Sequence, residues 1–138
     1  MEAVAKLKNI PMSVRKMRLV VDNIRGKDVE TALDILQFTK KEASEWLKKV
    51  VLSAIANWEY KTGGAEDADD YELFVKIAFA DAGTMLKRFR PAPHGRAHRI
   101  RKHTCHVTII VENAQPLPNE EAEIEEVDSE EVEMQLEE

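Results

Sequence analysis

The chain has 138 residues, with 20 Lys and Arg, 26 Asp and Glu, and a formal net charge of −6. This length allows one domain with one modest core, and the single cysteine, Cys105, excludes an internal disulfide. No apolar stretch approaches the roughly 20 residues that span a bilayer, and the start lacks the apolar core of a signal peptide. The sequence therefore predicts a cytoplasmic protein without a membrane partner.

The charges are distributed unevenly along the chain. All 20 Lys and Arg, and 15 of the 26 Asp and Glu, lie before residue 119, which gives that part a formal charge of +5. The other eleven acidic residues lie in Asn119–Glu138, which contains no Lys or Arg. Such an asymmetry is typical of a basic body that faces nucleic acid and carries an acidic appendage. We expect a domain over 1–115 and a flexible, solvated tail over 116–138. A second interpretation, in which the tail shields the basic surface until RNA displaces it, stays open.

One strand and one helix are predicted at the start of the chain. Residues 3–10 have the mixed pattern of a short edge strand that ends at Pro11. Ser13 is a good N-cap and Gly26 a good stop for the helix that follows. Four apolar residues of this helix recur at helical spacing: Val14, Met17, Val21 and Ile24.

Two more helices follow. Asp28 is the expected N-cap of the second, and Thr39 with Glu42 forms a T-x-x-E capping box that predicts the start of the third. Trp46 and Trp58 are twelve residues apart, close to one face of the third helix, so we expect core packing from them rather than base stacking.

The apolar period then changes from helical to alternating. Residues 71–81 place four large apolar side chains on one face of a strand: Leu73, Val75, Ile77 and Phe79. Residues 104–112 form a second β-branched run. Between the two runs, three turn residues mark a midpoint: Pro91, Pro93 and Gly95. The pattern predicts an α+β fold, with three helices packed on a small three-stranded antiparallel sheet and a long protruding β-hairpin arm at about 83–104.

This arm is strongly basic. No Asp or Glu occurs from Ala82 to Val111, whereas seven Lys and Arg and all four His do. Alternation places Arg99 and Arg101 on one face and Lys102 on the other. Because a ribbon lying on a surface needs charge on one face alone, charge on both faces indicates an arm surrounded by nucleic acid. The arm's predicted RNA contacts are Lys87, Arg88, Arg90, Arg96, Arg99, Arg101, Lys102 and His106.

A second basic cluster surrounds the first helix. Asp22 is the one acidic residue between Glu2 and Asp28, so we favour RNA contact over a merely solvated face. Its predicted contacts are Arg15, Lys16, Arg18, Arg25 and Lys27.

Metal binding and catalysis have little support. His94 and His98 are four apart, but Gly95 and the nearby prolines oppose a helix there, and the paired spacing of zinc ligands is missing. We interpret Cys105 as a partly buried filler. No phosphate-binding Gly loop or nucleophile elbow occurs. The sequence predicts neither an enzyme nor a cofactor.

Four segments together resemble one family: SVRKMRLVVDNIRGK (13–27), ALDIL (32–36), AIAN (54–57) and KRFRPAPHGRAHRIRKHTCHVTIIV (87–111). They are similar, in order and spacing, to the bacterial large-subunit ribosomal protein twenty-two family. The resemblance covers about residues 5–112.

The resemblance implies a structural constituent of the large ribosomal subunit that binds its rRNA and aids assembly. It further implies a hairpin that threads through the rRNA, with a tip that lines the nascent-peptide exit tunnel. The implied partners are rRNA, neighbouring ribosomal proteins and the nascent peptide, with no obligate homo-oligomer. At the tip this chain has Ala92-Pro93 where the family commonly has Arg-Ala, which removes one cation and stiffens the turn.

Two other classes of protein fit parts of the pattern. A DNA-architectural protein also combines helices with Pro-tipped basic arms, but usually works as a dimer of shorter chains without an acidic tail. A protein-binding adaptor would use the acidic tail instead.

Overall fold

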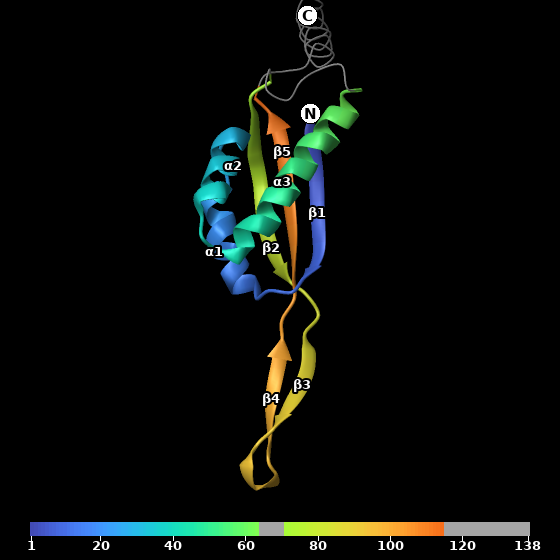
Figure 1. Ribbon diagram of the computed structural model, residues 1–138. Coiled ribbons are helices and arrows are strands. Elements are labelled where there is room, and N and C mark those ends of the chain that lie inside the picture. The colour runs from blue at the N-terminus through green and yellow to red at the C-terminus, as the bar shows by residue number, and fades with distance from the viewer. Residues whose placement is uncertain (64–70, 115–138) are drawn as a thin grey trace, which may run out of the picture.

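The computed structural model describes residues 1–63 and 71–114 (Figure 1). Its elements are β1 (Glu2–Ile10), α1 (Val14–Ile24), α2 (Val29–Phe38), α3 (Glu42–Lys61), β2 (Leu73–Ala82), β3 (Leu86–Pro91), the 3₁₀ turn η1 (Pro93–Gly95), β4 (Ala97–Lys102) and β5 (Cys105–Asn113). Within these ranges, three α-helices and two antiparallel sheets form an α+β fold. No helix among them is long and apolar enough to cross a membrane. The predicted acidic tail over 116–138 lies outside the described residues.

The strands belong to two separate sheets. β1, β5 and β2 form a three-stranded antiparallel sheet in that order, so β1 is an edge strand, as predicted. β3 and β4 pair with each other in a two-stranded sheet, here called the ribbon (86–102), which extends away from the helices (Figure 1). The predicted single long hairpin differs in detail, because its strands are divided between these two sheets. Residues 83–85 and 103–104 leave strand geometry and divide the two sheets.

The core lies between the three-stranded sheet and the helices, with α3 over β1 and β5 and α1 against β2. The strands contribute both small and large side chains to it, such as Ala3 and Ile109, and the helices contribute Met17 and Trp58, all almost fully buried. Side chains of different sizes fill the space between the layers. Trp58 is thus a core residue as predicted, and Trp46 is half-buried against the same core.

The buried face of β2 differs from the predicted one. The register against β5 shifts between Val75 and Ile77, which makes Lys76 the extra residue of a β-bulge. Beyond the bulge the faces exchange, because side chains alternate along a strand. Ile77 and Phe79 are therefore 41% and 39% exposed, and Ala78 occupies the core position instead. The prediction that Ile77 and Phe79 share a face with Val75 was wrong.

Lys76 explains where the bulge occurs. Glu2 and Glu112 are directly opposite each other in the pairing of β1 with β5, which brings two like charges together. Lys76 forms an ion pair with Glu2, and its Nζ lies 3.0 Å from Glu112 Oε2. The hydrogen bond between Lys76 and Glu2 lowers the pKa of the Glu2 carboxyl and raises the pKa of the Lys76 amine. The bulge thus places one cation between two carboxylates.

The predicted capping box is also incorrect. α3 begins at Glu42 with Lys41 as its N-cap, while Thr39 is the C-cap of α2. The Thr39 hydroxyl donates to Ile35 O at 2.6 Å, so it serves the end of the preceding helix. Ser44 Oγ instead ties the start of α3 to the linker, donating to Lys41 O at 2.6 Å. Ile35 O also accepts from the Thr39 N–H at 3.1 Å, so the backbone and the side chain of Thr39 both close the end of α2.

The other predicted helix boundaries are confirmed. Ser13 and Asp28 occupy the N-cap positions of α1 and α2, although neither side chain makes a capping hydrogen bond. Gly26 follows α1 with a φ of +70°, a conformation that glycine adopts without the steric cost of a Cβ.

The outer edge of β1 is covered by side chains of α3. Asn57 Nδ2 donates to Val4 O at 3.0 Å, and Lys61 Nζ donates to Glu2 O at 2.8 Å. An open edge strand presents unpaired carbonyls that invite pairing with another chain. Asn57 and Lys61 satisfy two of these carbonyls.

The bulge predicts unequal costs for two similar truncations. Val75→Ala should lower the free energy of unfolding by about 2 kcal/mol, because it removes buried methyl groups and leaves a cavity. Ile77→Ala should cost about 1 kcal/mol or less, because that side chain is already partly in water. Urea denaturation of both variants measures the difference, and an equal, large loss for Ile77→Ala would mean that Ile77 belongs to the core.

Candidate nucleic-acid interface

Cross-strand pairing sorts the ribbon side chains onto two faces. The odd face carries Lys87, Phe89, Pro91, Ala97, Arg99 and Arg101. The even face carries Leu86, Arg88, Arg90, His98, Ile100 and Lys102. Each face has three Lys or Arg, which confirms the prediction that cations lie on both sides of the arm.

These cations are open to solvent, and none of them forms an ion pair with a carboxylate of the described residues. Every residue of β3 and β4 is exposed except the half-buried Ile100. The salt bridges recorded among residues 1–63 and 71–114 all lie in the body rather than in the ribbon. Lys87 and Arg101 are even directly opposite each other. Like charges that face each other across a strand pair destabilise it. The positive charge of the ribbon is thus not neutralised by carboxylates of the described residues.

The tip of the ribbon is a tight turn. The Ala92 N–H donates to Arg96 O at 2.8 Å and closes it. Pro93 and Gly95 lie inside the turn and Pro91 ends the strand before it, in agreement with the predicted turn residues. His94 has a φ of +60° and Gly95 one of +68°. Two successive left-handed residues reverse the chain within three positions.

A neck of closely packed residues joins the ribbon to the body. Gly83 N–H donates to Thr104 O at 2.8 Å, and Thr104 Oγ1 donates to Thr84 O at 2.7 Å. A Cβ on Gly83 would collide with the Thr104 side chain and come within 3.1 Å of His106 Cε1. Glycine is therefore required at position 83 because the two chains of the neck approach so closely.

His106 belongs to this neck. Its Nδ1 accepts a hydrogen bond from the Asn9 N–H at 2.9 Å, so the ring ties the end of β1 to β5. Asn9 has a φ of +59°, which Asn tolerates better than most residues. The sequence predicted an RNA contact at His106, and the structure gives the ring an intramolecular partner that the prediction did not include.

The five predicted contacts around α1 are all exposed, but two of them also hold the sheet. Arg18 Nε donates to Ala80 O at 3.1 Å. Arg25 Nε and Nη2 donate to Ala78 O at 3.0 and 2.8 Å. All three bonds cover the outer edge of β2, as side chains of α3 do for β1.

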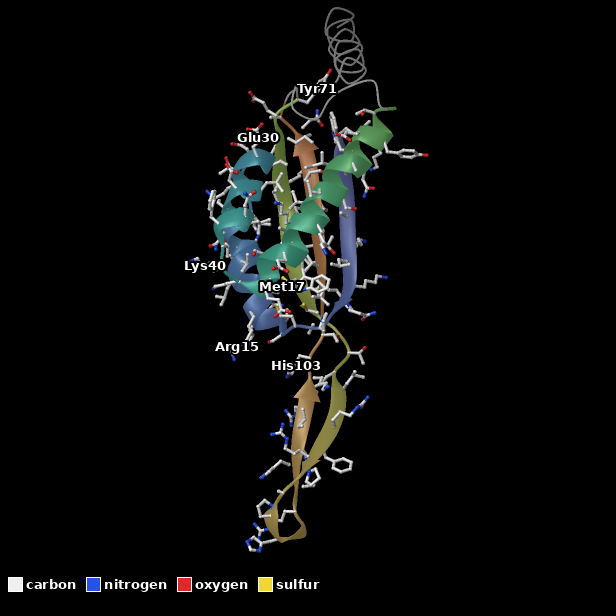
Figure 2. All side chains as sticks on the ribbon, viewed as in Figure 1. Arg15, Met17, Glu30, Lys40, Tyr71 and His103 are labelled. Carbon is white, nitrogen blue, oxygen red and sulfur yellow. The ribbon has the colours of Figure 1, made fainter. Side chains whose placement is uncertain are left out.

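The remaining three cations are placed differently. Arg15 and Lys16 are at the start of α1, and Figure 2 shows Arg15 at the end of the body from which the ribbon extends. Lys27 O accepts from the Val75 N–H at 2.9 Å, so its backbone continues the cover of the β2 edge. The α1 cluster thus runs from the ribbon end of the body along the edge of β2.

The histidines and the cysteine do not converge. His94, His98 and His103 are exposed along the ribbon and neck, while Cys105 is fully buried in the core. Figure 2 shows His103 where the ribbon meets the body. Burial raises the pKa of the Cys105 thiol. No group of three His, Cys, Asp or Glu suited to a metal ion occurs in the described parts of the chain. Cys105 is more deeply buried than predicted.

One feature of the ribbon escaped the sequence analysis. The odd face borders a groove of about 550 Å³. Its lining is Lys87, Phe89, Arg99 and Arg101 of that face, Arg88 and Ile100 of the even face, and Met85 of the neck. The sequence signal for this groove was an aromatic residue, Phe89, that alternates with cations such as Lys87 along the strand. Counting the apolar residues of the arm does not detect it.

An α+β body with a projecting ribbon that is cationic on both faces defines a protein with a basic arm. A sequence profile for the family "Ribosomal protein L22p/L17e" matches residues 5–112. The large ribosomal subunit protein uL22 of Flavobacterium johnsoniae is 60% identical over 111 residues, which cover 79% of each chain. The uL22 proteins of Christiangramia forsetii and Bacteroides fragilis are 58% and 53% identical over 109 residues, or 79% of this chain and 80% and 79% of theirs.

The chain therefore belongs to the L22p/L17e family of ribosomal proteins of the large subunit. This confirms the predicted family and supports the prediction that the protein is not an enzyme. It also favours the ribosomal interpretation over the DNA-architectural and adaptor alternatives.

The two kinds of α1 cation predict different effects on stability. Arg25→Ala should lower the free energy of unfolding by about 1 kcal/mol, since it leaves Ala78 O without its charged donor at a partly exposed site. Arg15→Ala should change it by less than about 0.5 kcal/mol, because that side chain is a surface residue. Chemical denaturation of both variants tests this, and equal stabilities would remove the structural role of Arg25.

Proposed function

We propose that this protein is a structural component of the large ribosomal subunit that binds large-subunit rRNA through the ribbon and the α1 cluster. The observation that carries the proposal is the equal division of cations between the two ribbon faces, three on each. A ribbon that lies on a surface uses one face. A ribbon with both faces charged and exposed is suited to a channel lined by phosphates.

The stability of the ribbon supports the same proposal. A two-stranded ribbon alone in water is marginally stable at best, and this one has no buried face of its own. Its six-residue strands extend about 20 Å at roughly 3.3 Å per residue. Surrounding phosphates would compensate the repulsion between Lys87 and Arg101 and hold both strands. The partner that the ribbon binds is also the partner that orders it.

Arginine dominates the ribbon, which fits phosphate as the ligand. Arg88, Arg90, Arg96, Arg99 and Arg101 outnumber the lysines Lys87 and Lys102. A guanidinium offers a planar fork of donors that matches two phosphate oxygens, whereas an ammonium acts as a point charge. The ribbon is thus equipped for oriented contacts with the RNA backbone as well as for general attraction.

The position of the tip supports a further part of the proposal. The tip is the part of the ribbon farthest from the helices (Figure 1). With the ribbon inserted in rRNA, the turn at 92–96 lines the nascent-peptide exit tunnel, and the body contacts neighbouring ribosomal proteins. Pro93 in place of the common family Ala makes this tip stiffer, and Ala92 in place of Arg makes it less cationic.

Counterion release tests the proposal. If about four of the seven ribbon cations meet phosphates, log K for an rRNA fragment should fall against log salt with a slope near −3. The double variant Arg99→Gln/Arg101→Gln should reduce the magnitude of this slope by about 1.5, at roughly 0.7–0.9 per phosphate contact.

A double variant in the body is the matched control. Lys40→Gln/Lys41→Gln removes the same formal charge from exposed positions before α3 and should leave the slope nearly unchanged. Binding isotherms at four or more salt concentrations give the slopes. Equal slopes for the two double variants would contradict the assignment of phosphate contacts to the ribbon.

A further inference from the structure

The side chain of Phe89 is placed unusually for an apolar group. It is 75% exposed on the odd face, directly opposite Arg99 in the ribbon register. The one aromatic ring pair among the described residues is Trp58 with Tyr71, and the one cation–π contact is Lys49 with Trp46. The Phe89 ring thus has no stacking partner within the described parts of the chain, and its face is open to one from outside.

The surroundings of Phe89 restrict what that partner is. The groove beside the ring is lined by Lys87, Arg99 and Arg101 of the odd face, by Arg88 and Ile100 of the even face, and by the apolar Met85 of the neck. Its volume of about 550 Å³ accommodates a planar group larger than a side chain. Four cations beside an aromatic ring disfavour a cationic or purely apolar occupant. They favour a planar group that carries negative charge beside it.

An unpaired nucleotide has both of these properties. Every base has a π-face that stacks on an aromatic ring, and the adjoining phosphates match the cations. A base within a duplex is already stacked on both sides and does not present such a face. We propose that the odd face of the ribbon holds one unpaired base of RNA, with the base on Phe89 and its flanking phosphates on Lys87 and Arg101.

The even face lacks this arrangement. Its cations Arg88, Arg90 and Lys102 accompany Leu86 and Ile100, and the one ring on it, His98, is opposite Arg90. The two faces therefore have different tasks. The even face contacts the RNA backbone, and the odd face contacts the backbone and also stacks on a base.

A pair of probes with equal phosphates isolates the stacking contact, which rests on the proposed RNA-binding function. The probes are a 12-nucleotide single-stranded RNA and its fully abasic counterpart. The full-length protein should bind the RNA between roughly fivefold and a hundredfold more tightly than the abasic strand. Phe89→Leu should remove most of this preference without changing the salt slope, because no charge is lost.

Two further variants complete the test. Phe89→Tyr should keep the preference, because its ring still stacks, and Leu86→Ala should also keep it, because that residue lies on the even face. The melting temperature should be the same for Phe89→Leu and the unchanged protein, since the side chain is mostly in water. If Phe89→Leu melts at a lower temperature than the unchanged protein, Phe89→Tyr takes its place in the comparison. Loss of the preference in Phe89→Tyr would then contradict the proposal.

The outcomes separate this inference from the proposed function. Equal, salt-sensitive affinity of the unchanged protein for both probes overturns the base site and leaves RNA binding intact. A preference that survives in Phe89→Leu also overturns it, because another residue then holds the base. Failure to bind either probe or an rRNA fragment overturns both proposals.

Discussion

Like charges that face each other in the ribbon set the main constraint on how the ribbon is held. Lys87 faces Arg101 across the strands, and Lys102 lies one position further along on the other face. Neither strand buries a core that would offset this repulsion. The body must therefore fold without help from the ribbon and hold it by its base alone. The ribbon is held to the body by close packing at the neck, where Gly83 contacts Thr104.

In the body, side chains of the same kinds cover the open edges of the sheet. A three-stranded sheet has two open edges, and each is covered from a helix: Asn57 and Lys61 serve β1, and Arg18 and Arg25 serve β2. Long cationic side chains suit this role because their stems lie along the protein while their donors reach a carbonyl. Arg18 and Arg25 lie in the α1 cluster that we assign to RNA, so fold and binding share residues there.

Much of the fold could be predicted from the sequence, because its signals are local. The helical spacing of Met17, Val21 and Ile24, the caps and the change to alternation at β2 each depend on a few adjacent residues. The family resemblance and the charges on both ribbon faces were predictable for the same reason. The bulge at Lys76 could not be predicted, because Lys76 pairs with Glu2 and Glu112, which are distant from it in sequence.

The other errors, in the fold and at the candidate site, have the same origin. Thr39 was assigned to the wrong helix because two helix ends compete for one hydroxyl, and local pattern does not decide that competition. The bonds of Arg18 and Arg25 to β2 span more than fifty residues and leave no sequence signature. The groove beside Phe89 exists only once β3 and β4 are paired in register. Contacts between distant segments are what the sequence alone could not supply.

The central claim, that RNA surrounds the ribbon, is tested most directly by lysine footprinting. Lys87 lies on the odd face and Lys102 on the even face, so the ribbon carries one lysine on each side. Acetylation of the free protein and of its complex with large-subunit rRNA, read by mass spectrometry, reports the accessibility of both amines. The account predicts that both become protected in the complex while Lys40 in the body stays reactive. Protection of one ribbon lysine alone would show that the ribbon lies on an RNA surface and would contradict the account.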